Sequence, residues 1–328
     1  MASTAALVLA LSTMLRCTVY DYDLGGDRPT GEGPGDASTG LVGWAATANC
    51  GPSGTTGGLG GPTHTATSTA ELIELAAAAG PSIIEISGVI DLNGEVLEIG
   101  SDKTLLGTGG AEIAGFTRIG DASNVIVRNI RFNGASSEST DAVEVTASTC
   151  VWLDHCEFFD GADGNLDIVR GSDWITVSWS KVYYVQRTDA HRLASLCGNS
   201  DEDTPGKINI TFHHNWWGPN LLSQMPRVRH GKVHIFNNYY SSSGNDYCIG
   251  AGYLSTLLVE NNLFDGVNTP IRFMDDQGTA QVLETGNVSS NTSGEFVSTG
   301  SAFEPPYIYT LEAADIAKDR VLASAGAR

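Results

Sequence analysis

Basic residues are scarce in this sequence. Only 18 Lys and Arg stand against 38 Asp and Glu, which gives a formal net charge of −20 at pH 7. Such a chain repels nucleic acid and anionic membrane surfaces unless its basic side chains gather in one place. We therefore expect no nucleic-acid partner. An acidic ligand would need local positive charge, either from a metal ion or from a few clustered arginines.

Long apolar runs at helical spacing are also nearly absent. Of the 328 residues, 41% are apolar and only 17% are charged, which is enough to bury a sizeable core. The 39 glycines and 11 prolines indicate many turns. We expect a body built mostly of strands and loops, as a single large β domain or as two smaller ones.

The paired CxxC spacing of a zinc site is missing as well. We therefore expect one or two disulfides, or buried thiols. The six cysteines are Cys17, Cys50, Cys150, Cys156, Cys197 and Cys248.

The first 40 residues differ in composition from the rest. Residues 2–15 form an apolar stretch of signal-peptide length, although no Lys or Arg precedes it, so we predict an export segment over 1–16 and a secreted protein. Cys17 suggests a possible lipid anchor, but Arg16 stands where a small residue would be expected. Residues 17–40 are rich in Gly, Asp and Pro and predict a flexible linker, with the folded domain over 41–328.

Six segments share a pattern of alternating apolar residues followed by a polar pair and an aromatic or aliphatic pair. Four of the five intervals between their aligned anchors are 24 or 26 residues, and one is 35, which indicates an insertion of about eleven residues. The anchors are Asn129, His155, Trp179, His214, Asn238 and Asn262.

A fixed period of this length predicts a right-handed parallel β-helix, an all-β solenoid in which each interval is one coil. A Rossmann sheet would need helical patterns between the strands, and a sandwich would not need the period. Val, Ile, Leu and Phe at alternate positions would form the core. We expect Asn129, Asn238 and Asn262 to lie at sharp bends, where asparagine tolerates left-handed backbone.

Two helices are expected outside the coils. Ser68 or Thr69 is a candidate N-cap, and Gly80 with Pro81 is a stop signal, so a short helix between them should cap the open first coil. Residues 311–325 predict a terminal helix that covers the other end.

Three aspartates are candidate metal ligands. Asp141 and Asp163 are 22 residues apart, close to one coil, and Asp167 follows four residues later, which would return its side chain to the same face of a strand. Three carboxylates without His or Cys suit Ca²⁺ better than zinc or copper. Each alone could instead be a solvated or turn-forming residue.

The stretches GTTGG, SDKTLLGTGG, VWLDHCEF, DGNLDIVRGSDWITVSW, NITFHHNWWG and MPRVRHGKVHIFNNYY resemble the pectate lyase and pectin lyase superfamily, from about Gly54 to Gly266. The resemblance implies a right-handed parallel β-helix that cleaves polygalacturonate by β-elimination. It also implies calcium binding by Asp141, Asp163 and Asp167, with Ser139 where some members have a fourth acidic ligand.

The same resemblance places the basic residues. In SQMPRVR, Arg229 matches a substrate-binding arginine, and Gln224 stands where the family has the arginine that removes the proton. A glutamine amide cannot accept a proton at useful pH. Leu193 stands in place of a substrate-binding lysine, so the adjacent Arg192 is a candidate for that role, and Arg227 is a third candidate for substrate binding.

Three hypotheses follow. The chain could be an active lyase in which Arg192, Arg227 or a water molecule near calcium replaces the missing base. It could instead bind polygalacturonate through calcium without turnover. A purely structural β-helix would leave the aspartates and Arg229 unexplained. We expect a monomer in each case.

Histidines and tryptophans near these motifs have simpler interpretations. His213 and His214 are neighbours on one predicted strand and should point to opposite faces, and with His230 they are expected to pack or hydrogen-bond rather than bind metal. One of Trp216 and Trp217 should face the core.

Overall fold

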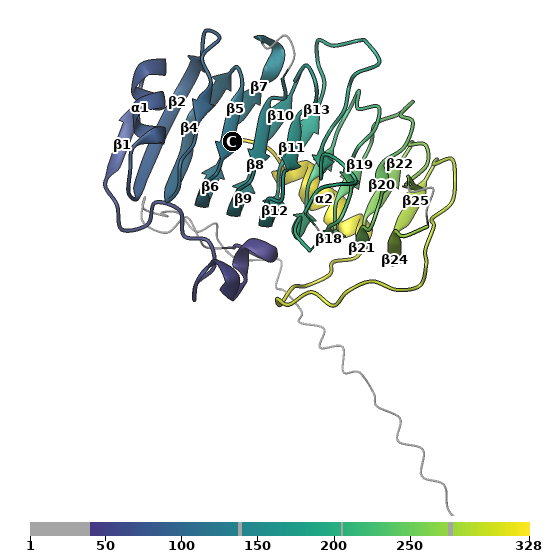
Figure 1. Ribbon diagram of the computed structural model, residues 1–328. Coiled ribbons are helices and arrows are strands. Elements are labelled where there is room, and N and C mark those ends of the chain that lie inside the picture. The colour runs from purple at the N-terminus through teal and green to yellow at the C-terminus, as the bar shows by residue number, and fades with distance from the viewer. Residues whose placement is uncertain (1–39, 137–139, 205, 275–277) are drawn as a thin grey trace, which may run out of the picture. The chain divides into compact units, whose positions relative to one another are not determined.

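Parallel strands stack coil upon coil through the length of the molecule (Figure 1). The computed structural model describes residues 40–136, 140–204, 206–274 and 278–328. The predicted export segment, Cys17, the predicted linker except Gly40, and Ser139 lie outside these residues. Every pairing between named strands is parallel, so the predicted parallel β-helix is confirmed.

One coil shows how the chain winds. Strand β8 (Val143–Thr146) lies in an eight-stranded sheet, β9 (Thr149–Asp154) follows after two residues, and β10 (Glu157–Phe159) follows after two more. Each pairs with the strand of the same kind in the next coil. The eight-stranded sheet consists of β3 (Leu97–Glu98), β5 (Thr117–Gly120), β8, β11 (Leu166–Val169), β14 (Leu196–Cys197), β17 (Arg227–Val228), β20 (Ile249–Ala251) and β23 (Ile271–Phe273).

The other strands form a 17-stranded sheet with two ladders that meet at β4 (Lys103–Ala114). The first ladder is β1 (Thr63–Ala66), β2 (Ser82–Asp91), β4, β6 (Ser123–Arg128), β9, β12 (Asp173–Ser178), β15 (Ile210–His213), β18 (Lys232–Phe236), β21 (Thr256–Glu260) and β24 (Gln281–Thr285). The second is β4, β7 (Arg131–Asn133), β10, β13 (Lys181–Tyr183), β16 (Trp216–Trp217), β19 (Tyr239–Tyr240), β22 (Leu263–Asp265) and β25 (Val288–Ser290).

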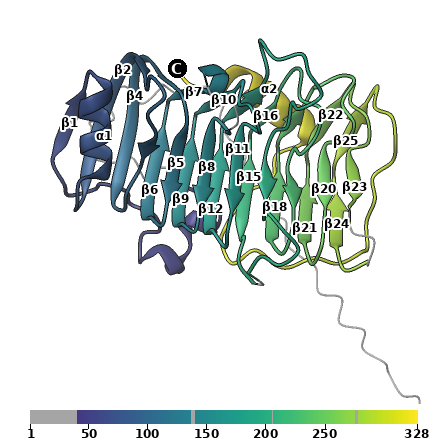
Figure 2. The ribbon, with the colours of Figure 1, turned by 45° about the horizontal axis from the view of Figure 1, so that its top comes forward.

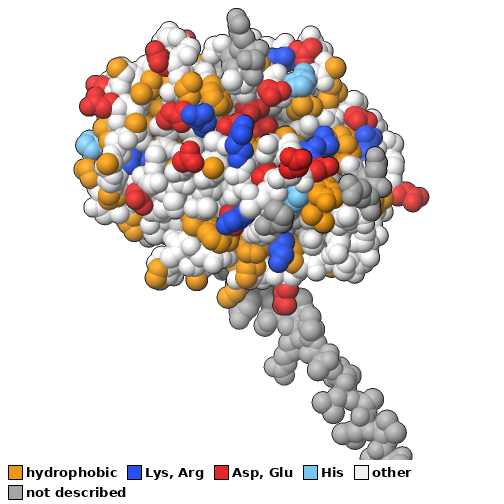
Figure 3. All heavy atoms as spheres, viewed as in Figure 1, with side chains coloured by type: hydrophobic (Ala, Val, Ile, Leu, Met, Phe, Trp, Pro, Cys, Tyr) orange, Lys and Arg blue, Asp and Glu red, His pale blue; other side chains and the backbone are white. Residues whose placement is uncertain are grey.

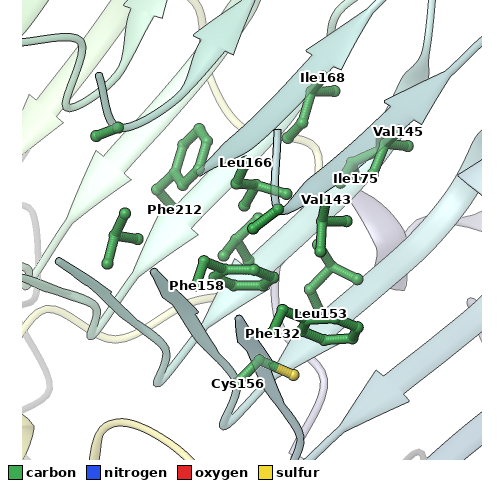
Figure 4. Packing of buried hydrophobic residues seen from close by; sticks show 14 of the residues in the cluster. Phe132, Val143, Val145, Leu153, Cys156, Phe158, Leu166, Ile168, Ile175 and Phe212 are labelled. Atoms are coloured by element: carbon green, nitrogen blue, oxygen red, sulfur yellow. The ribbon is translucent and has the colours of Figure 1, made fainter. Parts of the chain in front are cut away.

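The core lies inside the coils because alternate residues of every strand point inward. Val143 and Val145 of β8 are buried, and so are Leu166 and Ile168 of β11, which pair with them (Figure 4). Aromatic rings stack in the same way, as Phe132 and Phe158 do with centroids 5.6 Å apart. Stacking like on like makes one continuous core, as the repeat predicted.

The bends after the first ladder have left-handed backbone, as expected, but two of the anchors are displaced by one residue. Asn129 has φ 63°, which confirms its predicted place in a bend. The prediction for Asn238 and Asn262 is wrong, since Asn237 and Asn261 carry the positive φ. In each case two asparagines are adjacent in the sequence, so the pattern alone could not tell which of the two lies in the bend.

Asn238 and Asn262 instead belong to a buried ladder of side chains, one rung in each coil. The Asn215 backbone N–H donates to Asn238 Oδ1, the Asn238 N–H to Asn262 Oδ1, and the Asn262 N–H to Asn287 Oδ1, each at 2.9 Å. Each side-chain amide therefore satisfies a backbone group of the preceding coil, which pins the coils in register.

The N-terminal helix α1 (Thr69–Ala77) follows the predicted signals. Ser68 is its N-cap and accepts a hydrogen bond from the Glu71 N–H, while the Glu71 carboxylate accepts from the Thr67 N–H at 2.9 Å. Leu72 and Ala76 are fully buried in the main core. This helix packs on β1, β2 and β3 and covers the first coil.

Both ends of the described chain run along the outside of the coils. Near the N-terminal end, 3-10 helices η1 (Trp44–Ala46) and η2 (Ala48–Cys50) lie against β9, where Cys50 forms a disulfide with Cys150. A third, η3 (Gly134–Ser136), follows β7. Cys156, Cys197 and Cys248 are buried free thiols, so the described cysteines include both of the predicted alternatives, a disulfide and buried thiols.

The C-terminal helix α2 (Ala314–Ser324) was predicted to cover the far end, and this is wrong. It lies along the side of the coils, where Ala314 and Val321 pack against Tyr239 and Leu263 (Figures 1 and 2). The chain then runs back toward earlier coils, and Arg328 reaches Asn129. Local sequence determines that these residues form a helix. Where the helix packs depends on which apolar side chains the coils leave on their outer surface. Neither described helix is long and apolar enough to cross a lipid bilayer.

Candidate active site

The outer face of the eight-stranded sheet carries a row of polar residues from successive coils. Glu144 on β8 pairs with Arg118 on β5 and with Asp167 on β11. Further along, Leu196 on β14 pairs with Arg227 on β17. Because residues in register stack above one another, acidic residues of earlier coils and arginines of later coils share one face.

Asp141 and Asp167 are brought together across Gly164. A Cβ atom at Gly164 would lie 2.7 Å from Asp141 Oδ1 and 3.2 Å from Asp167 Oδ1, so a side chain there would occupy the space between the two carboxylates. Asp167 Oδ1 accepts the Leu196 N–H at 2.9 Å. Asp141 is only 7% exposed, and its Oδ1 is buried without a hydrogen-bond partner among the described residues.

The surroundings of this pair disfavour two uncompensated negative charges. Burial, and then repulsion from Asp167, Asp163 and Glu144, raises the pKa of Asp141 well above its ordinary value. Burial also raises the pKa of Asp167, with added repulsion from Asp163 and Glu144. A cation bound between the carboxylates would remove this repulsion, so the pair fits a divalent metal ion.

Asp163 is placed differently from the expectation. It lies in the turn before β11 rather than on the strand, so strand alternation does not set its direction. Its Oδ1 is 2.8 Å from His191 Nε2, and its side chain is 65% exposed. The described residues contain no group of three His, Cys, Asp or Glu already arranged to hold a metal ion. The three-aspartate calcium site therefore stays a prediction.

The predicted insertion is shared between two loops, because β14 divides it. Residues 184–195 precede β14 and carry His191, and residues 198–209 follow it and carry Asp201. The Arg229 guanidinium donates to Asp201 Oδ1 at 3.0 Å and to the Gly198 carbonyl at 3.1 Å. Burial, and next the charge of Arg227, lowers the pKa of Arg229. The loops thus contact two predicted site residues, one acidic and one basic.

The other basic candidates differ in how far they are already engaged. Arg192 donates to the carbonyls of Asn220 at 2.8 Å and Asp189 at 2.5 Å. Arg227 Nε is buried without a hydrogen-bond partner in the described part of the chain. Gln224 is half-buried at φ 63°, just before β17. In Figure 3, basic side chains on the visible face are scattered among acidic ones and form no broad basic patch.

The histidines near the motifs pack as expected, with one correction. His213 and His214 do not point to opposite faces, since their Nδ1 atoms are 3.0 Å apart, because the positive φ of His214 bends the chain at the end of β15. His230 contacts the Asp201 carbonyl. Trp217 is buried in the core and Trp216 is not, as predicted.

Glu144 is an acidic residue of this face that the motif analysis missed. A signal was present, because Glu144 lies 23 residues before Asp167, which is one coil, at an outward position of the alternating segment VEV. It matched no residue of the family motifs, and so it was not considered.

Solved structures share this fold. The crystal structure of a pectate lyase from Bacillus sp. N165 in complex with trigalacturonate is 29% identical and matches with a TM-score of 0.72, over 88% of this chain and 99% of that one. Fold and site together define a parallel β-helix protein with carboxylates and arginines on one face.

Sequence comparison identifies the family. The family model described as pectate lyase matches residues 35–328. A pectate trisaccharide-lyase of Bacillus licheniformis is 32% identical over 296 residues, 83% of each chain. That of Thermotoga maritima is 39% identical over 204 residues, 58% of this chain and 54% of that protein, so the chain spans about half the length of this relative. The chain belongs to the pectate lyase family.

Proposed function

We propose that this protein binds polygalacturonate through calcium and cleaves it by β-elimination, at a rate limited by Gln224. The observation that carries the proposal is the pair Asp141 and Asp167, which converge beside Gly164 at the sheet that also bears Arg227, with Arg229 just after the same strand. Family membership supports it, and so does the trigalacturonate bound by the relative from Bacillus sp. N165.

Each residue has a role that its surroundings support. Asp141 and Asp167, with Asp163, would hold Ca²⁺, which supplies positive charge against the uronate carboxylate and the anion formed when the α-proton leaves. Arg229 would bind a uronate carboxylate, as a rigid guanidinium does well, after exchanging Asp201 for the substrate.

The departure at Gln224 means that another residue must accept the proton. Gln224 can hydrogen-bond to sugar but cannot take the proton. Arg192 is already bound to two carbonyls, whereas the buried Arg227 Nε has no partner among the described residues and stands on the same face as the carboxylates. We therefore assign proton removal to Arg227, acting slowly because an arginine is a poor base unless its pKa is lowered.

The proposal includes the setting of the reaction. The Cys50–Cys150 disulfide supports an oxidising, extracellular location for the domain over 41–328, with export through residues 1–16 and a linker over 17–40. We propose a monomer. A lipid anchor at Cys17 is the alternative to free secretion.

Gln224 favours a second function, a binding module that keeps calcium and polymer affinity without turnover. One experiment separates the two: purified protein is given polygalacturonate with calcium or with a chelator. Calorimetry follows binding of trigalacturonate, and ultraviolet absorbance follows unsaturated uronides. The lyase predicts calcium-dependent binding and product at alkaline pH, and the binding module predicts binding alone. Absence of calcium-dependent binding would contradict both.

A further inference from the structure

We propose that Glu144 is a calcium ligand of this protein and supplies the carboxylate that is missing at position 139. The inference rests on the proposed calcium dependence and deepens it. Neither the family motifs nor the comparisons assign this residue a role.

The first argument is position. Glu144 is stacked directly on Asp167, its partner in the β8–β11 register, so the two Cα atoms are one strand spacing apart, about 4.8 Å. Both side chains point outward, since Val143 and Val145 on either side of Glu144 are buried. Glu144 also lies three residues after Asp141, and its charge acts on both aspartates.

The second argument is that the Glu144 carboxylate is free of hydrogen bonds and ion pairs among the described residues, although its charge acts on Arg118. Arg118, its neighbour in the preceding coil, is held by Glu98, with Nε and Oε2 3.0 Å apart. Glu144 makes no ion pair or hydrogen bond to another residue within 40–136, 140–204, 206–274 and 278–328. It lines a hollow of about 470 Å³ together with Thr140, Arg118 and Arg170, so a hydrated ion can reach the Glu144 carboxylate from solvent.

The third argument is the buried Asp141 Oδ1. This oxygen has no hydrogen-bond partner in the described part of the chain and belongs to a side chain more than nine-tenths buried. It is aimed at the space beside Gly164 that Asp167 also faces. An unpaired buried carboxylate oxygen is costly, and a cation at this point would satisfy it.

The fourth argument is the coordination number that calcium prefers, which requires more oxygen ligands than the aspartates provide. Ca²⁺ takes six to eight oxygens, of which Asp141 and Asp167 can give no more than four, and Asp163 is turned to His191. Ser139 brings no carboxylate at the position where some family members have one. Glu144 is longer than aspartate by one methylene, which suits a ligand that must reach across from the adjacent strand.

The test uses the full chain and two variants, Glu144→Gln and Glu144→Asp. Calcium affinity is measured by calorimetry. Tb³⁺ luminescence lifetimes in H₂O and D₂O give the number of water molecules on the bound ion. We expect both variants to bind calcium about tenfold more weakly or worse and to gain about one water on Tb³⁺, because a ligand depends on reach as well as on charge.

Two controls accompany these variants. Glu85→Gln on β2 removes the same charge from the other sheet and should leave calcium affinity unchanged. Asp167→Asn should abolish calcium binding. Circular dichroism checks that each variant is folded. If Glu144→Gln does not fold, Glu144→Asp alone still tests the inference.

Several outcomes would overturn the inference. If Glu144→Asp binds calcium like the parent with unchanged hydration, Glu144 acts only through its charge. If Glu144→Gln is also unchanged, the residue has no part in the site. Absence of calcium binding by the parent would remove the proposed calcium dependence as well. Calcium binding that depends on Glu144 without polymer cleavage would support this inference while contradicting the proposed activity.

Discussion

At the scale of single residues, Gln224 is the position where this chain departs most from the family motif. Gln224 lies just before the strand that carries Arg227, and its backbone carbonyl accepts the Ser195 N–H at 2.7 Å. The backbone is thus held in place, and only the side-chain chemistry differs. The left-handed φ of 63° disfavours glutamine and arginine alike, since both are long side chains that are not branched at Cβ.

Changing Gln224→Arg should therefore raise the rate of unsaturated uronide formation by about 100-fold or more, because it restores a group able to accept the proton. The measurement is the increase in ultraviolet absorbance with polygalacturonate and calcium at alkaline pH. Gln224→Leu is the matched control, since it removes the amide without adding a base.

An unchanged rate in Gln224→Arg would mean that proton removal does not limit turnover at this position. In that case Arg227→Lys should still lower the rate, as the assignment of the proton to Arg227 requires. An unchanged rate in both Gln224→Arg and Arg227→Lys would contradict both assignments.

At the scale of elements, the asparagine ladder holds neighbouring coils together. Asn238 is fully engaged, since its Oδ1 accepts from Asn215 N and Nδ2 and its Nδ2 donates to the carbonyl of Phe212 and to Asn262 Oδ1. All of these groups are shielded from water. Its rungs run from Asn215 to Asn287, so the ladder holds the coil of Arg227 and its neighbours in register, whereas Asp141 and Asp167 lie in earlier coils.

We predict that Asn238→Ala lowers the free energy of unfolding by about 3 kcal/mol, because the buried Asn215 N–H loses its acceptor and the Phe212 and Phe236 carbonyls lose a donor. Asn287→Ala, at the partly exposed last rung, should cost only about 1 kcal/mol. Denaturant unfolding measures both. Equal costs for the two variants would show that the ladder does not act through buried hydrogen bonds.

At the scale of the whole molecule, the segment 303–328 ties several coils together from outside. His234 is fully buried, with Nδ1 2.9 Å from Tyr307 Oη and Nε2 2.9 Å from Glu260. The Glu312 carbonyl accepts from the amides of Asn237 and Asn261. Burial lowers the pKa of His234, and likewise of His213 and His214.

These shifts predict loss of stability in acid. A histidine whose pKa is lowered by folding binds a proton more readily when unfolded, so its contribution is present above the unfolded pKa of about 6.5 and is lost as pH falls through it. We expect the Tm to fall between about pH 7 and pH 5, and less steeply in His234→Gln. His64→Gln, on β1, is the control and should keep the parent slope.

The carboxylates Asp141 and Asp167 act in the opposite sense over the same range, because their raised pKa values favour the protonated folded state at lower pH. The comparison of His234→Gln with the parent isolates the histidine. Identical slopes would contradict a role for His234 in acid unfolding.

Local sequence determined a large part of this protein. Alternating apolar residues at a nearly constant interval are enough to predict a parallel β-helix, because period two sets which side chains face inward and the interval sets the length of a coil. The N-cap at Ser68 and the stop at Gly80 likewise act within a few residues, so α1 was predictable. The family motifs indicated Asp141, Asp167 and Arg229 without any coordinates.

Tertiary structure alone decided how these residues meet. The pairing of Glu144 with Asp167, the turn that directs Asp163 to His191, and the contact of Asp201 with Arg229 depend on register and loop paths that join residues 23 to 28 positions apart. The docking of α2 on the side of the coils depends on which apolar side chains remain uncovered. Such contacts join segments that are distant in the sequence. Many arrangements of these segments have comparable free energies when each segment is considered alone, and packing in the complete fold decides which one forms.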